Sequence, residues 1–150
     1  MGNIFNQDFR DFIQAFNDND VEYILVGGFA VILHGHARVT GDMDLWVNNT
    51  EDNYNKILIA FKQFGMPVFD MSKELFLDNK NQDVFKFGRK PVAIDIMTKV
   101  KGLDFSECIK FVIEFYDDEL KVITLHKNHL IKAKKAAGRL KDIDDINWLS

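Results

Sequence analysis

Residues 26–47 read VGGFAVILHGHARVTGDMDLWV, and this stretch decides the expected fold. It begins at the end of an apolar run, passes through Gly27-Gly28 and a short apolar segment, and enters a polar, basic turn. It ends in a second apolar run that carries Asp42 and Asp44 two positions apart. The pattern predicts a strand, a glycine turn, a helix, a loop and a second strand with paired carboxylates. Such an order can place phosphates and metal ions side by side.

Three aspartates occupy the polar faces of predicted strands. Asp42 and Asp44 are two apart, so both side chains point to one face, about 6–7 Å apart along the strand. Asp95 lies on the face opposite the apolar residues of the run at 91–97. If they converge, three acids can hold two divalent ions about 3.5–4 Å apart. The alternative is that these aspartates are simply solvated on an exposed strand face. The rarity of Asp inside strands argues against this alternative.

Gly27 and Gly28 stand where a strand is expected to give way to a helix. Glycines there let backbone N–H groups approach a phosphate, and the helix N-terminus adds positive potential. The pattern matches neither a P-loop nor Gly-x-Gly-x-x-Gly. Taken alone, the pair is equally consistent with a tight turn that binds no ligand.

The remaining periodicities predict a single α+β or α/β domain, because helical and strand patterns are mixed along the chain. Helices are expected at 4–18, 29–34, 50–64, 104–111, 125–137 and 141–149. Strands are expected at 21–26, 42–47, 91–97, 111–116 and 119–123, with two further short strands around 76–77 and 84–88.

Length, composition and charge limit the classes of protein to which this sequence can belong. The chain has 150 residues with 47% hydrophobic content, which suits one domain with a sizeable core. Its formal net charge of -4 argues against a protein whose whole surface binds nucleic acid. A single Cys108 forms no disulfide framework, no run approaches the roughly 20 apolar residues of a membrane span, and no signal peptide is visible. We therefore expect a cytoplasmic protein with no membrane partner.

Basic residues cluster before and after the carboxylates. Arg38 and Thr40 lie in the loop before Asp42, where Arg38 could bind a phosphate or hold the loop through backbone hydrogen bonds. Residues 126–141 carry no acid and six basic residues, namely Lys127, Lys132, Lys134, Lys135, Arg139 and Lys141. Helical spacing would align Lys127, Lys134 and Lys141, which favours Lys134 as a contact to a triphosphate or an RNA acceptor. The alternative is a solvated helix face, and Asp142 and Asp145 are expected to pair with basic neighbours.

Taken together, these motifs resemble the polymerase-beta-type nucleotidyltransferase superfamily. The resemblance rests on Gly27-Gly28, on GDMDL at 41–45 and on IDI at 94–96. The version GGxAVxxHGxxRxTxDxD is most similar to small bacterial nucleotidyltransferases, a group that includes toxin-like transferases of abortive-infection systems. Residues 130–145 resemble the C-terminal part of the same group.

The resemblance implies a nucleotidyltransferase fold over residues 1–150, with a mixed β-sheet flanked by helices. The core would cover about 4–123 and a helical tail about 124–150. The implied reaction is attack of an acceptor hydroxyl on the α-phosphorus of ATP or another NTP, which transfers NMP and releases pyrophosphate. Two Mg²⁺ ions, or Mn²⁺ in their place, would be the cofactors.

The resemblance also implies a role for each site residue. Asp42 and Asp44 would ligate both metal ions, and Asp95 would ligate the catalytic metal and help activate the acceptor hydroxyl. The nucleotide would be bound by Gly27, Gly28, Arg38, Thr40 and Lys134.

Several alternatives remain open at this stage. The chain could be a non-catalytic nucleotide-binding module, or an antitoxin-like regulatory partner in a two-gene system. The acceptor could be a tRNA, a protein hydroxyl or a small molecule such as an aminoglycoside. Because the tail motif lies close to Ser150, the acceptor surface is expected to come from short helices, a homodimer interface or a cognate partner protein.

Overall fold

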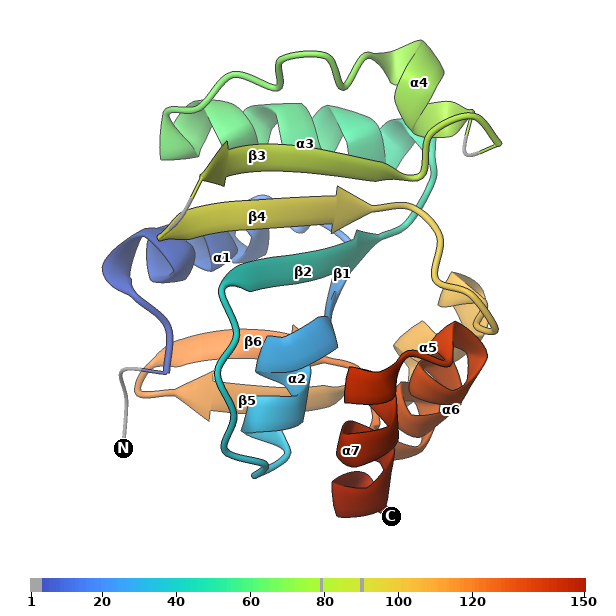
Figure 1. The fold of residues 1–150 in the computed structure, drawn as a ribbon. Helices are drawn as coiled ribbons and strands as arrows, with labels where there is room; N and C mark the ends of the chain where they lie inside the picture. The colour runs from blue at the N-terminus through green and yellow to red at the C-terminus, as the bar shows by residue number, and fades with distance from the viewer. Residues whose placement is uncertain (1–3, 79, 90) are drawn as a thin grey trace.

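A mixed β-sheet with strand order β3-β4-β2-β1-β6-β5 forms the centre of the computed structural model, which describes residues 4–78, 80–89 and 91–150 (Figure 1). Its strands are β1 (Tyr23–Val26), β2 (Asp42–Val47), β3 (Val84–Arg89), β4 (Val92–Met97), β5 (Ile113–Asp117) and β6 (Leu120–Thr124). Strand β2 pairs antiparallel with β1 and parallel with β4. Strands β1 and β6 are parallel, and β3-β4 and β5-β6 pair antiparallel. The structure confirms the expected α+β fold.

Two amphipathic helices, α1 (Gln7–Asp18) and α3 (Glu51–Phe64), pack side by side behind the sheet in Figure 1. The N-caps Asn6 and Thr50 each accept a hydrogen bond from a backbone N–H in the first turn, which stabilises the helix starts. Phe12 and Phe61 meet edge to face with ring centroids 5.4 Å apart, and both are buried. This aromatic layer supplies much of the apolar burial that holds the sheet in place.

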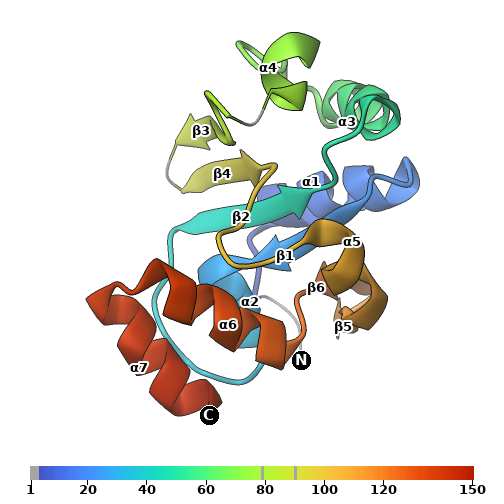
Figure 2. The same ribbon diagram turned by 90° about the vertical axis from the view of Figure 1, so that its right-hand side faces the viewer.

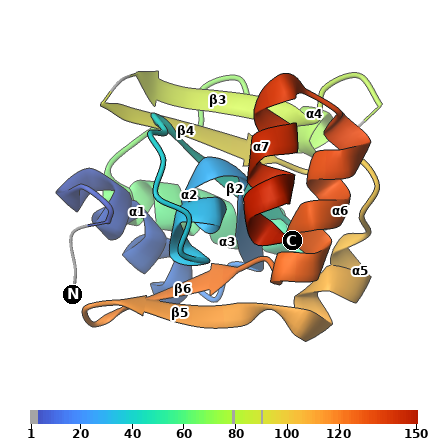
Figure 3. The ribbon, with the colours of Figure 1, turned by 60° about the horizontal axis from the view of Figure 1, so that its bottom comes forward.

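Helices α2 (Gly27–Leu33), α6 (Lys127–Ala137) and α7 (Leu140–Leu149) lie on the other side of the sheet, as Figures 2 and 3 show. Helix α6 ends at Gly138, whose left-handed φ of 66° suits glycine. Helix α7 then runs beside α6 (Figure 3). The remaining short helices are α4 (Lys73–Leu77), α5 (Phe105–Cys108) and the 3₁₀ turn η1 (Ile109–Phe111).

Two local predictions were wrong, the strand at 76–77 and the position of Lys141. The expected strand at 76–77 lies in α4, because Ser72 caps that helix and Phe76 points into the core. Trp46 shares the face of Asp42 and Asp44 on β2 and is buried there, edge to face against Phe105. Lys141 lies in α7, so it cannot share one helical face with the lysines of α6.

No helix in the described parts of the chain is both long enough and apolar enough to cross a membrane. The strand predicted at 84–88 is present as β3, and the other predicted helices and strands are present with ends shifted by a few residues. The division of the chain into a core and a helical tail stays a prediction.

Candidate active site

Strand register places two of the predicted acids, Asp44 and Asp95, in one row across the sheet. Val26 of β1 is the register partner of Asp44 on β2, and Asp44 is the partner of Asp95 on β4. Lys86 of β3 is in turn the partner of Asp95. Neighbouring strands lie about 4.8 Å apart, so residues in such a row are close enough to share a cation. The alternate positions face the core and are almost fully buried, namely Met43, Leu45, Ile94 and Ile96.

Asp44 occupies the middle of this row. Burial, together with the negative charges of Asp95 and Asp42, raises the pKa of Asp44 to about 7. Lys86 opposes this shift, and its Nζ lies 3.2 Å from Oδ2 of Asp95. The oxygen atoms of the three acids do not all come within 4.8 Å of one another in the part of the chain that the structure describes. Asp44 thus lies between two other carboxylates, and the positive charge of Lys86 does not fully offset their effect on its pKa.

Gly27 and Gly28 admit two neighbouring side chains to the turn between β1 and α2. Gly27 has a φ of 71°, and a Cβ atom at this position would overlap the carboxylate of Asp44. A Cβ atom on Gly28 would lie 2.5 Å from Oγ1 of Thr40. The glycine pair therefore has a steric reason that is independent of any phosphate, since larger residues would displace Asp44 and Thr40.

A polar cavity of about 270 Å³ opens beside this turn. It is lined by all five residues predicted to contact a nucleotide and by two of the acids, that is, by Gly27, Gly28, Arg38, Thr40, Lys134, Asp42 and Asp44. The structure thus brings together residues from the turn, the loop before β2 and helix α6. Only the third acid, Asp95, lies outside this cavity among the predicted site residues.

A second cavity of about 460 Å³ lies along β4 and contains Asp95 and Lys86. Asp44 lines both cavities, and so do the basic side chains of Lys134 and Arg139. The two spaces therefore meet at Asp44, with Asp42 on one side and Asp95 on the other.

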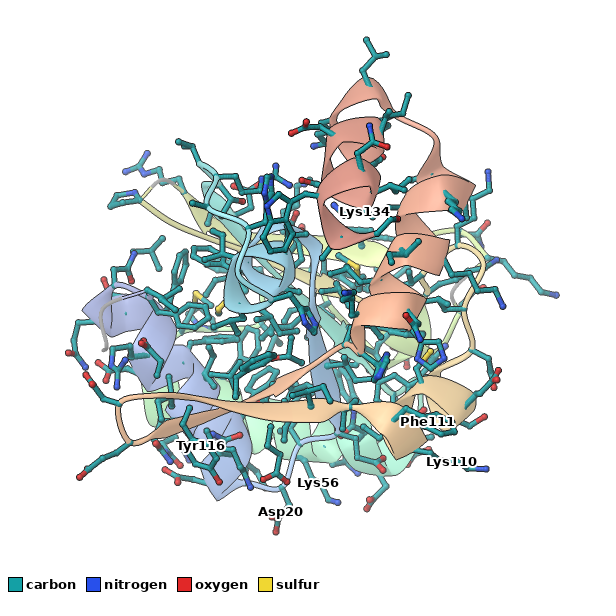
Figure 4. All side chains as sticks on the ribbon, turned by 90° about the horizontal axis from the view of Figure 1, so that it is seen from below. Asp20, Lys56, Lys110, Phe111, Tyr116 and Lys134 are labelled. Atoms are coloured by element: carbon teal, nitrogen blue, oxygen red, sulfur yellow. The ribbon has the colours of Figure 1, made fainter. Side chains whose placement is uncertain are left out.

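The basic side chains of the site are held by two carboxylates of α7. Nη1 of Arg38 lies 2.5 Å from Oδ2 of Asp145, and Nζ of Lys134 lies 3.1 Å from the same oxygen. Nζ of Lys134 also lies 3.4 Å from Oδ1 of Asp142, and Nε of Arg139 lies 2.7 Å from Oδ2 of the same residue. Lys134 is only 5% exposed, and Figure 4 shows it beside α6 and α7. The expected pairing of Asp142 and Asp145 with basic neighbours is confirmed, and Arg38 makes an ion pair that the sequence did not indicate.

This pairing also shifts the pKa values of the charged groups. Burial alone would raise the pKa of Asp142, but the hydrogen bonds and charge of Arg139 outweigh it and lower that pKa. The same hydrogen bonds raise the pKa of the Arg139 guanidinium. Both groups therefore stay charged, and the ion pair persists across the neutral pH range.

His36 belongs to the same network. Its Nε2 lies 3.8 Å from a carboxylate oxygen of Asp144 and of Asp145, and its ring packs against Trp148 at 4.8 Å. Three potential metal ligands thus come together, but Asp145 already accepts from Arg38. We assign this group to the contact between α7 and the loop before β2.

Lys86 is a site residue that sequence reasoning missed. Its alternation within VFKFGR indicates a side chain on the polar face of β3, which is a detectable signal. Its pairing with Asp95, however, follows from the β3-β4 register, which a single sequence does not reveal.

No protein-family model and no curated protein matches this sequence. Solved structures do. The nucleotidyltransferase candidate TM1012 from Thermotoga maritima aligns with a TM-score of 0.63 and 16% identity over 94% of this chain and 89% of its own. The lincosamide antibiotic adenylyltransferase LnuA, solved with lincomycin, aligns with a TM-score of 0.63 and 16% identity over 99% and 98%.

An antigenic nucleotidyltransferase-like protein from Paracoccidioides brasiliensis aligns with a TM-score of 0.52 and 15% identity over 93% of this chain and 72% of its own. Identities this low show the fold alone. The mixed sheet, the row of acids and these likenesses agree: the chain has the nucleotidyltransferase fold.

Proposed function

We propose that this protein is a metal-dependent nucleotidyltransferase that moves NMP from an NTP to a hydroxyl acceptor. The observation that carries the proposal is the position of three acids on one face of the sheet. Asp42, Asp44 and Asp95 share one face of the sheet beside Gly27-Gly28, where two cavities meet. Phosphoryl-transfer sites need this combination of clustered carboxylate oxygens and space on both sides.

The acids fit a pair of Mg²⁺ ions. Magnesium prefers oxygen ligands and is usually held by one or two carboxylates together with substrate phosphates. The raised pKa of Asp44 reports negative charge that a divalent cation would offset. Asp42, Asp44 and Asp95 would hold these ions. When bound, the ions would neutralise charge that develops on the phosphate oxygens.

The chain's own groups would position the reactants. The acceptor oxygen bonds to the α-phosphorus, the bond from that phosphorus to the bridging oxygen of the β-phosphate breaks, and pyrophosphate leaves. Asp95 receives the hydroxyl proton, and Lys86 donates a hydrogen bond to its Oδ2. The N–H groups of Gly27 and Gly28 bind phosphate oxygens, and Thr40 supports the turn.

Basic side chains would complete the nucleotide site. Arg139 and Lys141 line the polar cavity, and the Arg139 side chain is 56% exposed, so it can reach a phosphate. Arg38 and Lys134 add positive charge at the wall of the same cavity, and their ion pairs with Asp145 fix their positions. We propose that they orient the triphosphate mainly through this fixed field.

Label transfer tests the proposal. The protein is incubated with each α-labelled NTP, Mg²⁺ or Mn²⁺, and total cell RNA and protein, and the products are separated. We expect transfer that chelation of the metal abolishes and that Asp42→Ala abolishes, whereas Asp144→Asn, at an exposed carboxylate outside both cavities, keeps it. Absence of transfer to any acceptor would contradict the proposal, and NTP binding without transfer would support a nucleotide-sensing module instead.

A further inference from the structure

We propose that the cavity along β4 is the acceptor site and that it takes an acceptor carrying a phosphate group near its reactive hydroxyl. This inference rests on the proposed function and narrows it. Its two supports are the position of the cavity relative to the three acids and the charge of the side chains that surround it.

The positions of the two cavities suggest which one holds the NTP and which one holds the acceptor. Asp42 and Gly28 line only the polar cavity and Asp95 lines only the β4 cavity, while Gly27 and Asp44 line both. In-line displacement needs the attacking oxygen and the leaving oxygen on opposite sides of the phosphorus. An α-phosphate at Asp44 with pyrophosphate in the polar cavity would therefore be attacked from the β4 cavity.

The walls of the β4 cavity are of two kinds. Apolar side chains of β3, β4, the following loop and α6 form one part, among them Val84, Met97, Val100 and Leu130. Lys86, Lys99 and Lys101 add three positive charges at the same cavity. A volume of about 460 Å³ suits a small molecule or the end of a larger one.

Within the described part of the chain, the β4 cavity has more basic side chains without a carboxylate partner than the polar cavity has. Lys134 and Arg139 are held by carboxylates of α7, and Lys86 is paired with Asp95. Lys99 and Lys101 are exposed, and neither forms an ion pair with any residue that the structure describes. The polar cavity has one such side chain among the described residues, Lys141, so in a chain with a net charge of -4 the β4 cavity carries the larger excess of positive charge.

Such a field favours an anionic acceptor over a cationic one. Phosphate is the common anion that stands next to hydroxyl groups in nucleic acid ends and in small phosphorylated alcohols, and lysine binds it as a point charge. A polycationic acceptor such as an aminoglycoside would be repelled by Lys99 and Lys101. The shared chemistry is thus phosphate beside a hydroxyl, with the rest of the acceptor on the apolar wall.

Defined acceptors test this inference. Transfer from α-labelled ATP is measured to a short oligoribonucleotide with a free 3′-hydroxyl, to glycerol 3-phosphate, to glycerol and to kanamycin. The double variant Lys99→Glu/Lys101→Glu is compared with Lys110→Glu, a charge reversal at an exposed residue of η1 that lines neither cavity (Figure 4). Anisotropy of the labelled oligoribonucleotide gives a binding readout that needs no turnover.

We expect transfer to at least one phosphorylated acceptor, and the preferred one identifies the source as nucleic acid or small molecule. The double variant should raise the KM for that acceptor about tenfold or more, as loss of charge-assisted contacts predicts. The KM for ATP should stay unchanged, and Lys110→Glu should behave as the parent protein. Preference for glycerol, kanamycin or a protein acceptor, or an acceptor KM that the double variant leaves unchanged, would overturn the inference and leave the proposed function standing. Absence of transfer to these acceptors and to total RNA and protein would instead overturn the proposed function.

Discussion

Asp44 and Asp95 are register partners on the parallel strands β2 and β4, so two carboxylates meet on one face of the sheet. Burial of Asp44, together with the repulsion between these carboxylates, raises its pKa to about 7. An unfolded Asp titrates near pH 4. The folded protein therefore binds the Asp44 proton more tightly than the unfolded chain, and its stability falls as pH rises from about 4 through about 7.

Asp44→Asn should remove this loss because the amide cannot ionise. In the presence of a chelator we expect the variant to melt several degrees above the parent protein at pH 8, with the difference shrinking towards pH 4. Differential scanning calorimetry at both pH values measures this. Equal melting temperatures at pH 8 would show that folding does not raise the pKa of Asp44. The variant should lack transferase activity in either case.

Gly28→Ala should impair the site with little effect on the fold elsewhere. The new Cβ atom would lie 2.5 Å from Oγ1 of Thr40, so the loop before Asp42 must move. A displacement of about 1 Å at a reacting group can cost about 100-fold in rate, and we expect a loss of kcat/KM of this order.

Gly65→Ala is the matched control for that change. Gly65 has a φ of 92°, but a Cβ atom there meets nothing within 4 Å. It should lose about 1 kcal/mol of stability through backbone strain and keep its activity. Equal activity losses in the two variants would show that the space next to Thr40 is irrelevant.

Asp145→Asn should destabilise the fold by about 3 kcal/mol, because breaking a buried ion pair leaves uncompensated charge on Lys134 and Arg38. Asp144 is its neighbour in sequence, with a side chain 83% exposed. Asp144→Asn should change stability by less than about 0.5 kcal/mol. Urea unfolding of both variants gives the comparison, and similar midpoints would contradict a structural role for the α7 carboxylate.

His34 should make stability fall on the acid side of neutrality. Burial lowers its pKa, although its Nε2 donates to the carbonyl oxygen of Leu125 at 2.8 Å, which opposes the shift. The unfolded histidine has a pKa near 6.5, so the unfolded chain binds more protons below that pH. The contribution of neutral His34 is therefore complete above about pH 6.5 and is lost as pH falls through the lower folded pKa.

His34→Gln keeps a donor for Leu125 and removes the titration. We expect the melting temperature of the parent protein to drop more steeply between pH 7.5 and 5.5 than that of this variant. Parallel curves for the two proteins would show that His34 does not titrate in this range.

The sequence predicted the elements around the site well because their signals are local. Alternation in residues 42–47 and the break at Gly27-Gly28 each depend on neighbours in the chain. Ser72 offered a comparable signal, since its side chain caps α4 by accepting from the N–H of Leu75, and this feature could have corrected the strand expected at 76–77.

Relationships between strands were harder to predict. Nothing in one sequence states that β4 pairs with both β2 and β3, and these two pairings place Asp95 beside Asp44 and Lys86. The partner of Arg38 is likewise on α7, at the other end of the chain. Long-range pairing depends on the packing of the whole domain, which periodicity does not contain.

The strand order has a consequence for how the protein loses function. Strands β4, β2 and β1 are interior, while β3 and β5 form the two edges of the sheet. A slip of β4 by one residue would turn Asp95 to the far face and put Ile94 or Ile96 in its place. Activity would thus require the central strands to be fully paired. Local opening of the edge strand β5 would leave it unchanged, and it would be lost only when the whole domain unfolds. Turnover measured during heating should therefore disappear with the main unfolding transition and report on the fidelity of the sheet itself.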